Sequence, residues 1–421
     1  MTAGERHAAA AAVERGPDGR ASWWRLLVAV LLTAIGGVGM WSVVVALPTV
    51  QAEFGVARGG ASFPYTLTMI GFGLGGVALG RLADRRGIVL PSILGCGLLA
   101  LGYVAAGLAP NLPAFAIAQG LLIGAGASAS FAPLIAEISL WFVRRRGIAV
   151  AICASGNYVA GAFWPPVVQW GIATHGWRAT HVGIGIVCAA LMPPLVMALR
   201  TRPNFSSAAQ AAAQPHFVPA RLTLSPGALQ GLLIVAGVAC CVAMAMPQVH
   251  IVAYCGDLGY GVARGAEMLS LMLGFGIVSR IASGFVADRI GGLLTLLIGS
   301  ALQGLALFLY TLSDGLTQLY VISALFGLFQ GGIVPSYAMI VREYFPPQEA
   351  GTRVALCMTA TLFGMALGGW LSGVIFDLTG SYRVAFLNGI AWNLLNGAIV
   401  LFLLVRRRPA LRSGSGQPAP A

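Results

Sequence analysis

The chain has 421 residues, of which 58% are hydrophobic and only 9% are charged. Soluble domains carry about a quarter charged residues, so this composition excludes an ordinary soluble enzyme or binding module. The formal net charge is +12, and all 25 basic residues are arginine, because the chain contains no lysine. Such basicity suits either a nucleic-acid partner or a membrane orientation signal, and the positions of the arginines distinguish the two.

Twelve apolar segments, each about as long as a bilayer-spanning helix, follow one another along the chain. We expect each to be a helix, because backbone polar groups in lipid must be satisfied within the segment. We expect the first span to be kept as a signal-anchor and not cleaved, since residues 1–23 are too polar for the core of a signal peptide. The expected spans are 24–48, 62–81, 88–108, 113–138, 148–172, 182–200, 227–254, 266–286, 292–312, 317–341, 354–377 and 384–405. The sequence therefore predicts an all-α membrane protein with twelve transmembrane helices.

The arginines lie mainly on one side of these spans. With the N-terminus inside, twenty of the 25 fall in the tails and cytoplasmic loops, whereas Arg58, Arg178, Arg264 and Arg383 fall outside and Arg280 lies in the membrane. This asymmetry follows the positive-inside rule. We therefore expect a multi-pass protein of the plasma membrane, bacterial inner membrane by this interpretation, with both termini cytoplasmic. No nucleic-acid partner is needed to explain the charge.

Two loops of the chain repeat each other. GRLADRRG (Gly80–Gly87) and GFVADRIG (Gly284–Gly291) both read G-x-x-x-D-R-x-G and start 204 residues apart. A repeat of this length predicts two similar halves related by an axis along the membrane normal. The expected units are a cytoplasmic tail (1–23), a six-helix bundle (24–200), a cytoplasmic linker (201–226), a second six-helix bundle (227–405) and a C-terminal cytoplasmic tail (406–421).

This organisation resembles the major facilitator superfamily over essentially the whole chain. The superfamily's loop signature, G-x-x-x-D-R-x-G-R-R, lies between the second and third helices, and here Ile88 and Val89 replace its final basic pair. The resemblance implies two pseudo-symmetric six-helix bundles and an inner gate at these loops; the alternative is plain positive-inside turns. The implied gate residues are Gly80, Asp84, Arg85, Gly87, Glu137, Gly284, Asp288, Arg289 and Gly291.

Physical roles for the gate residues can be stated separately. The first glycine of each loop allows helices to approach closely. The aspartates Asp84 and Asp288 suit the positive N-terminal end of a helix in the other half. We expect Arg85 and Arg289 to face lipid phosphates or a nearby acid, for which Glu137 is the candidate.

Arg280 stands within the otherwise apolar run 268–286, about fourteen residues into its span and so near mid-depth at ~1.5 Å per residue. Charged residues within spans are costly, by roughly 2.5–3.5 kcal/mol, and mark substrate or ion routes. A planar, permanently charged fork suits a carboxylate, whereas the alternative is an ion pair with a membrane acid, and the eighth span places none beside it. One cation at this depth is neutralised by a monoanion. The expected ligand is a small monocarboxylate.

The seventh span ends in MPQVHIVAYCGDLG, which places His250, Tyr254 and Asp257 along one helical stripe. An imidazole, a phenol and a carboxylate on one face could carry protons. The alternative is that His250 and Tyr254 sit at the membrane interface and that Asp257 caps the following loop.

Other spans contribute polar or aromatic groups. The candidates for lining a substrate cavity are Trp41, Asn157, Tyr158, Gln330 and Tyr337. For the aromatic members, packing between helices or a place in the interfacial belt is the alternative.

Three segments resemble the monocarboxylate/oxalate–formate transporter group more closely: WFVRRRGIAVAICASGNYVAG (141–161), SRIASGFVADRIGG and GVIFDLTGSYRVAF (373–386). The resemblance implies that Arg280 binds the substrate carboxylate. Animal monocarboxylate carriers have an acid one turn earlier, where Gly276 stands here, and a lysine in the first helix, which is absent. The lysine of the oxalate–formate exchanger is missing from 354–377, which disfavours dicarboxylates. The proton route is not transferable from the animal carriers.

The sequence thus predicts a secondary transporter that moves a small monocarboxylate by alternating access, with proton symport through Asp257 or His250. Its expected partners are the organic anion, protons and the lipid bilayer; a monomer without cofactor or metal is expected. The alternatives are an exporter or exchanger of a bulkier, aromatic acid, a membrane sensor, or a membrane-embedded enzyme. An enzyme is disfavoured because there is no H-E-x-x-H, paired intramembrane carboxylates or serine–histidine pairing. A sensor would carry an extra soluble domain.

Overall fold

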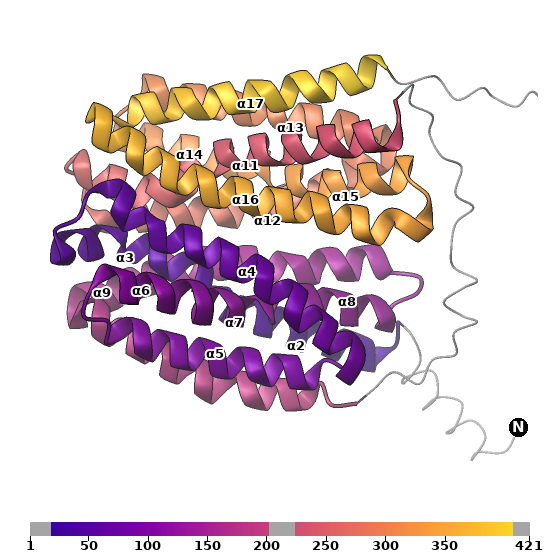
Figure 1. Cartoon of the computed structure of the whole chain (residues 1–421), viewed down its shortest axis with the longest axis horizontal. Coiled ribbons are helices and arrows are strands. Elements are labelled where there is room, and N and C mark those ends of the chain that lie inside the picture. Colours follow the sequence, from indigo (N-terminus) through magenta and orange to yellow (C-terminus); the bar gives the residue numbers. More distant parts are fainter. Residues whose placement is uncertain (1–17, 202–223, 407–421) are drawn as a thin grey trace, which may run out of the picture.

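The computed structural model describes residues 18–201 and 224–406, which are almost entirely helical (Figure 1). The first half of the chain supplies α2 (Arg20–Gly36), α3 (Val38–Phe54), α4 (Arg58–Arg86), α5 (Val89–Gly107), α6 (Leu112–Ile117), η1 (Ala118–Gly124), α7 (Ala125–Ser128), α8 (Ala132–Trp141) and α9 (Arg146–Ala198). The second half supplies α11 (Pro226–Asp257), α12 (Val262–Ile290), α13 (Gly292–Leu312), α14 (Leu316–Gln330), α15 (Ile333–Tyr344), α16 (Pro347–Thr379) and α17 (Tyr382–Val405).

Eleven helical segments of the described chain are long and apolar enough to cross a membrane. One of them, the 53-residue α9, contains Gly176 in a non-helical conformation (φ 79°, ψ 159°), so it consists of two crossings joined by a sharp turn. Each of the pairs α2–α3 and α14–α15, and the series α6–η1–α7–α8, forms one interrupted crossing. The predicted all-α membrane fold with twelve spans is confirmed.

The helices extend beyond the apolar segments from which they were predicted. The helix α4 runs from Arg58 to Arg86, and α12 runs from Val262 to Ile290. Both stop at the last glycine of a G-x-x-x-D-R-x-G loop, since Gly87 and Gly291 each adopt φ 83°. Residues other than glycine rarely adopt this backbone conformation. The positive φ therefore explains why the motif ends in glycine.

The duplication also extends to the backbone conformation of the loops. Three pairs of glycines with positive φ lie 204 positions apart: Gly55 and Gly259, Gly87 and Gly291, and Gly176 and Gly380. Positive φ at matched positions means that equivalent loops of the two halves turn in the same way. The repeat seen in two sequence motifs therefore continues through the fold.

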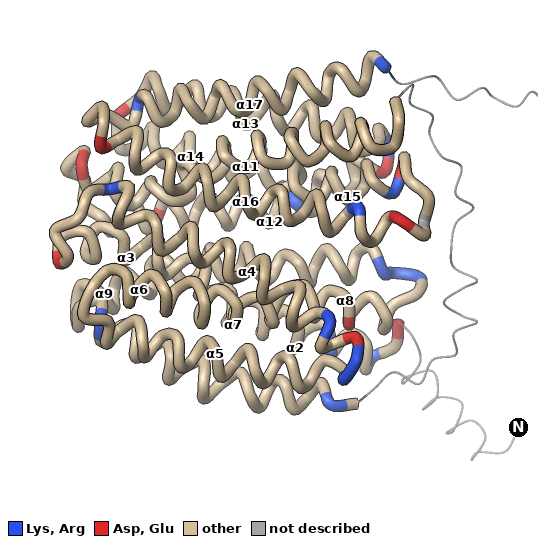
Figure 2. The backbone as a smooth tube through the Cα atoms, viewed as in Figure 1, with Lys and Arg blue, Asp and Glu red and all other residues tan. Residues whose placement is uncertain are grey.

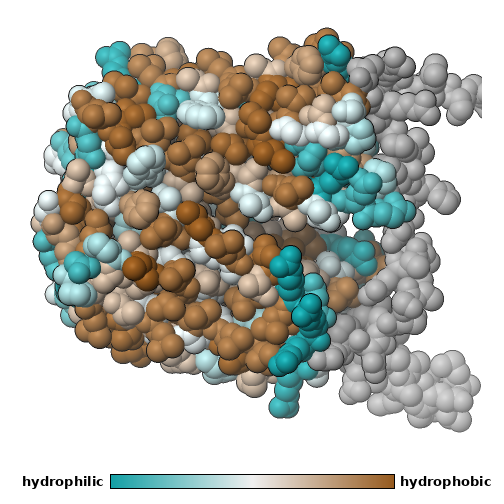
Figure 3. All heavy atoms as spheres, in the orientation of Figure 1, coloured by the Kyte–Doolittle hydropathy of each residue, from teal (hydrophilic) through white to brown (hydrophobic). Residues whose placement is uncertain are grey.

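Figure 1 shows the two halves as two stacked bundles whose helices run in the same general direction. The halves meet mainly where α9 packs on α12 and α4 packs on α16. We call the end that carries Arg20, Arg200 and Arg406 the terminal face, and the opposite end the distal face. Basic residues gather at the terminal face (Figure 2), and apolar side chains cover the middle of the surface (Figure 3).

Candidate substrate and gating site

Arg280 lies half-buried on α12, where it faces α9 of the other half. Its guanidinium carbon lies 4.7 Å from the ring centre of Tyr158, and Nη1 lies 3.4 Å from the carbonyl oxygen of Ala154. Its Nε is buried and has no hydrogen-bond partner. None of the ion pairs in the described part of the chain involves Arg280. The predicted alternative, a pair with a membrane acid, is not formed in this structure.

Tyr158 fills the space one turn before Arg280. A Cβ built on Gly276 would lie 2.4 Å from Cε1 of this ring, so the glycine admits the aromatic side chain. The guanidinium then rests against the ring face, an attractive arrangement for a cation. An aromatic face, not an acid, thus packs against Arg280 from α9, and the buried Nε of the guanidinium stays available to a ligand.

Three further predicted residues lie close to this pair. The indole Nε1 of Trp41 lies 3.4 Å from the carbonyl oxygen of Asn157, next in sequence to Tyr158. Gln330 ends α14 immediately before Gly331, whose N–H donates to Ser279 Oγ on α12 at 3.0 Å. The structure therefore places Trp41 against the backbone of Asn157, next to Tyr158, and Gln330 at the end of α14 that contacts α12 beside Arg280.

Gln330 also carries unused hydrogen-bonding capacity. Its Oε1 accepts from Gln248 Nε2 at 2.6 Å, whereas its own Nε2 is fully buried without a partner. The amide of Gln119, on the π-helical turn η1, is likewise buried with neither atom bonded. Buried polar groups normally have a partner, so these amides are available to water or to a ligand. Gln119 and Gln248 were missed in the sequence because an isolated glutamine in an apolar span has no periodic signal.

Tyr337 is not brought to this cluster. Its side chain is fully enclosed, and its hydroxyl donates to Asn396 Oδ1 at 2.9 Å within the second half. The amide nitrogen of Asn396 in turn donates to Ser300 Oγ at 3.0 Å. These contacts tie α15, α17 and α13 together, so the structure gives Tyr337 a packing role instead of a place in the cavity lining.

At the distal face, Arg58 joins the two halves. Its Nη2 lies 3.0 Å from Asp257 Oδ1, its Nη1 donates to the Tyr382 hydroxyl at 2.7 Å, and its backbone N–H donates to Asp377 Oδ1 at 2.8 Å. The other oxygen of Asp377 accepts from the N–H of Gly59 at 2.7 Å. A carboxylate at the N-terminus of α4 is favoured by the free N–H groups there. We call Arg58, Asp257, Asp377 and Tyr382 the distal gate.

His250 is linked to this gate through Tyr382. Its Nε2 lies 2.7 Å from the carbonyl oxygen of Gly369, which can only accept, so Nε2 carries the proton. Its Nδ1 then accepts from the Tyr382 hydroxyl at 3.0 Å. Because the imidazole is fully buried, it does not sit at the membrane interface.

The predicted stripe on the seventh span stays together around Tyr382. Asp257 and His250 belong to the surroundings of the distal gate, and the Tyr254 ring packs edge-on against Tyr382 with ring centres 5.3 Å apart. The Tyr254 hydroxyl donates to Asp314 Oδ1 at 2.7 Å within the second half. Arg58, Asp377 and Tyr382 were missed as gate residues. Arg58 was counted only as one of the outer arginines, and its partners lie about 200 and 320 positions away in the chain.

The loops of the terminal face are arranged differently in the described part of the chain. Asp84, Arg85, Asp288 and Arg289 are all exposed, and a Cβ on Gly80 or Gly284 would meet no atom within 4 Å. Within residues 18–201 and 224–406, no hydrogen bond or ion pair joins the halves at this end. The halves are therefore closed at the distal face and separated at the terminal face, and the carboxylates of the two loops do not reach the other half in this conformation.

Glu137 has a different partner from the one expected. Its Oε1 lies 2.7 Å from Arg25 Nη2 and accepts from Trp141 Nε1 at 3.1 Å, so it is not bound to Arg85 or Arg289. Arg25 is almost completely buried and also donates to the carbonyl oxygen of Leu199. Burial explains the choice, because a buried arginine needs a carboxylate more than an exposed one does.

Two hydrogen bonds between the halves repeat the internal duplication. The hydroxyl of Thr66 on α4 donates to the carbonyl oxygen of Ala366 on α16 at 2.8 Å. The hydroxyl of Ser270 on α12 donates to the carbonyl oxygen of Ala162 on α9. Both the donors and the acceptors are 204 positions apart. We call the contacts of α4 with α16 and of α9 with α12 the lateral seams. Each seam thus contains a hydrogen bond between the same kinds of group, a side-chain hydroxyl and a backbone carbonyl.

The family model of the Major Facilitator Superfamily matches residues 29–317 and 268–420. The chain belongs to this superfamily. It is therefore a multi-pass membrane transporter, and its family and fold are those of transporters, not of enzymes.

Relatives and solved structures agree with the family assignment. Monocarboxylate transporter 13 of Rattus norvegicus is 27% identical over 82% of this chain and 78% of its own length. The agnestins efflux protein AgnL12 of Paecilomyces divaricatus is 23% identical over 77% and 73%. A bacterial homologue of the human lysosomal transporter Spinster, in an inward-facing and occupied conformation, superposes with a TM-score of 0.71 at 14% identity, covering 92% of this chain and 98% of that one.

Proposed function

We propose that this transporter carries a small monocarboxylate by alternating access and that Arg280 binds the substrate carboxylate between the two halves. The observation that carries the proposal is the guanidinium of Arg280, which forms no ion pair among the described residues, has a buried Nε without a hydrogen-bond partner and rests against the Tyr158 ring. A carboxylate that meets this fork gains charge-assisted hydrogen bonds and neutralises the only arginine at this depth. The similarity to monocarboxylate transporter 13 supports the same substrate class.

The proposed cycle follows from the two gates. With the termini in the cytoplasm, as the arginine distribution favours, the terminal face opens inward and the structure corresponds to the inward-open state. Rocking of the halves about the lateral seams would then close the terminal loops and separate Arg58 from Asp257 and Asp377. In that state Asp84 and Asp288 would reach the other half as an inner gate.

Proton symport is proposed through the distal gate. In the closed gate Asp257 is bound to Arg58, with Tyr382 and His250 beside it. Protonation of Asp257 from the outside removes its charge and weakens its hold on Arg58. A proton and a monoanion entering together cross the membrane with no net charge, which avoids burying an uncompensated cation or anion.

The test is uptake into liposomes that contain the purified protein. Labelled lactate, pyruvate, benzoate and oxalate are offered with and without an inward proton gradient, to wild type and to Arg280→Gln. We expect gradient-dependent uptake of a monoacid, and at least a roughly tenfold loss in the variant, because a charge-assisted hydrogen bond contributes about 1.5–3 kcal/mol. Monoacid uptake that is unchanged in Arg280→Gln would contradict the proposed site.

An exporter of a bulkier acid is the second candidate, and the similarity to the efflux protein AgnL12 favours it. The same liposomes distinguish the two. Preference for benzoate over lactate, with efflux driven by an opposed proton gradient, would favour export; a preference for lactate or pyruvate with inward symport would exclude it.

A further inference from the structure

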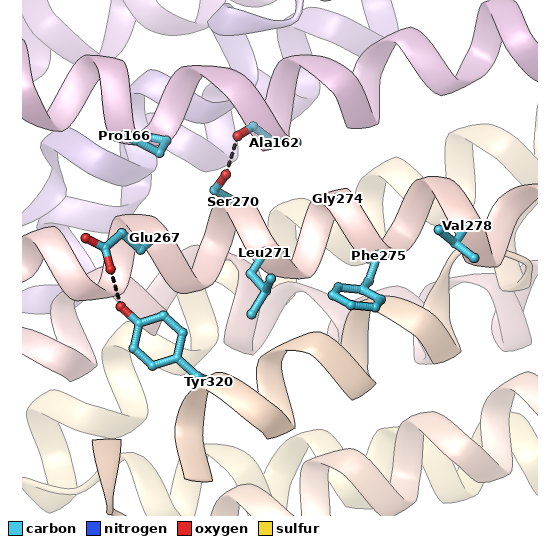
Figure 4. Close-up of a pocket in the computed structure, with 9 residues that line it drawn as sticks. All are labelled: Ala162, Pro166, Glu267, Ser270, Leu271, Gly274, Phe275, Val278 and Tyr320. Carbon is cyan, nitrogen blue, oxygen red and sulfur yellow. Dashed lines mark hydrogen bonds between the residues drawn. The ribbon is translucent and has the colours of Figure 1, made fainter. Parts of the chain in front are cut away.

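A groove on the outside of the bundle lies between the two halves. It has a volume of about 550 Å³. Figure 4 shows α12 in the middle, with Ala162 and Pro166 of α9 on one side and Tyr320 of α14 on the other. Its wall includes Phe275 and Val278, which are exposed in the part of the molecule that the bilayer surrounds. This volume lies within the roughly 300–1,000 Å³ range of small-molecule sites. The groove opens toward lipid, away from Arg280's route between the halves.

Two residues, Gly274 and Pro166, explain why a groove forms here. Gly274 has no side chain, and a Cβ there would lie 3.8 Å from Cβ of Ala162 across the seam. Pro166 has no N–H, so the carbonyl oxygen of Ala162 loses its helical partner and accepts from the Ser270 hydroxyl instead. Figure 4 shows this bond crossing from α12 to α9 beside the groove. The seam is held together here by one hydrogen bond instead of by packed side chains.

The charged groups beside the described part of the groove lie at its distal end. Glu267 accepts from the Tyr320 hydroxyl, and Arg264 Nη1 lies 3.0 Å from Glu267 Oε2. The side chains of Arg264 and Glu267 are about half exposed, so both charges can contact a ligand. A positive and a negative group therefore stand side by side above an apolar wall.

The length of the groove matches one leaflet of a membrane. From Glu267 to Val278 the helix rises by ~16 Å at 1.5 Å per residue. Half of a hydrocarbon core of about 30 Å is ~15 Å. The charged end thus falls at the depth of lipid headgroups on the distal side, and Val278 falls near the midplane.

We propose that this groove binds one acyl chain of a phospholipid from the distal leaflet, with its phosphate on Arg264 and a primary ammonium group on Glu267. A primary ammonium can donate to the carboxylate, whereas a quaternary ammonium cannot. The bound chain contacts α9 and α12 at once and so stabilises the conformation in which the distal face is closed. This site is independent of which acid the protein carries.

The site is tested with the full-length protein in lipid nanodiscs that contain phosphatidylethanolamine with a diazirine on its acyl chain. After illumination, mass spectrometry should find the cross-links concentrated in residues 162–166 and 271–278. Gly274→Leu fills the groove and should lower this labelling roughly fivefold or more, the size of effect that overpacking produces. Gly97→Leu, on an exposed part of α5 where a Cβ meets no atom, is the matched control and should leave it unchanged.

Competition by unlabelled lipids tests the headgroup contact. Phosphatidylethanolamine should displace the probe more effectively than phosphatidylcholine, and Glu267→Gln should remove this difference while keeping the acyl-chain labelling. Labelling spread evenly around the bundle, or unchanged in a monodisperse Gly274→Leu protein, would overturn the site. Equal competition by both lipids in wild type would overturn the ammonium contact. Neither readout depends on transport, so failure here is distinguishable from failure of the proposed function.

Discussion

At the scale of single residues, the neighbours of Arg280 decide what it can bind. Gly276 admits the Tyr158 ring, and the ring supports the guanidinium without neutralising it. A carboxylate at position 276 would lie one helical turn from Arg280, within reach of an ion pair. The identity of residue 276 should therefore control the affinity for an external anion.

Gly276→Asp tests this control, with Gly276→Asn as the matched variant. Both side chains collide with Tyr158 to the same degree, but only Asp supplies a charge that competes with the substrate. We expect Asp to weaken monocarboxylate binding roughly tenfold more than Asn, the factor that corresponds to about 1.4 kcal/mol. Calorimetric titration measures both. Equal affinities in the two variants would mean that the charge state of Arg280 does not govern binding.

At the scale of helices, the two lateral seams differ although they are related by the duplication. Ala366 belongs to an uninterrupted helix and its carbonyl can still accept from the N–H of residue 370, so Thr66 adds a second hydrogen bond. Ala162 precedes Pro166 by one turn, so Ser270 is its sole available donor at this position. Loss of Ser270 leaves the part-buried carbonyl of Ala162 unsatisfied beside the groove, whereas loss of Thr66 leaves the Ala366 carbonyl with its helical partner.

Ser270→Ala should therefore destabilise the distal-closed conformation by about 1–3 kcal/mol, and Thr66→Ala by only about 0.5–1.5 kcal/mol. Pro166→Ala gives residue 166 an N–H that can donate to the carbonyl oxygen of Ala162. The destabilisation caused by Ser270→Ala should therefore be smaller in the Pro166→Ala background. Distances between paired spin labels across the distal face report the populations of the closed and open states. Additive effects of Ser270→Ala and Pro166→Ala would contradict this explanation of the seam.

At the scale of the whole molecule, the two ends of the bundle are in opposite conditions. The distal face is closed by Arg58, Asp257, Asp377 and Tyr382, whereas the loops at the terminal face stand apart. The superposed bacterial structure is in an inward-facing conformation. Under the proposed cycle the protonation of Asp257 favours opening of the distal gate.

Neutralising Asp257 should thus increase the population with an open distal face. The sign follows from the charges: an uncharged side chain at this position no longer attracts Arg58, so the closed state loses stability. Asp257→Asn should populate the open state, whereas Asp314→Asn, on another distal carboxylate, should leave the closed state predominant. Spin-label distances across the distal face provide the measurement. Distances in Asp257→Asn that equal those of the wild type would contradict the role given to this ion pair.

The sequence was sufficient for features that depend on local pattern. Twelve apolar segments gave twelve spans, and the final glycines of both G-x-x-x-D-R-x-G loops coincide with positive φ at Gly87 and Gly291. Arg280 could be identified because a lone charge in an apolar run is visible without any neighbour. Its surroundings could be predicted in part, since Asn157 and Tyr158 lie in a polar break of an apolar helix.

Features that depend on pairing between distant segments were not predictable in the same way. Glu137 had several arginines within reach of its loop, and only burial in the folded chain selects Arg25. Arg58 and Asp377 are ordinary charged residues at helix ends until the two halves meet. Tyr337 was expected in the cavity because its polar hydroxyl stands in an apolar span, but Asn396 satisfies that hydroxyl inside the second half.

The most direct test of the central claim is the affinity of the purified protein for an acid and for its amide. Isothermal titration with lactate and lactamide, pyruvate and pyruvamide, and benzoate and benzamide is carried out on wild type and on Arg280→Gln. We expect that one acid of the series binds, that its amide binds at least roughly tenfold more weakly, and that Arg280→Gln abolishes this difference. Equal binding of acid and amide in wild type, or an acid preference that survives in Arg280→Gln, would contradict it.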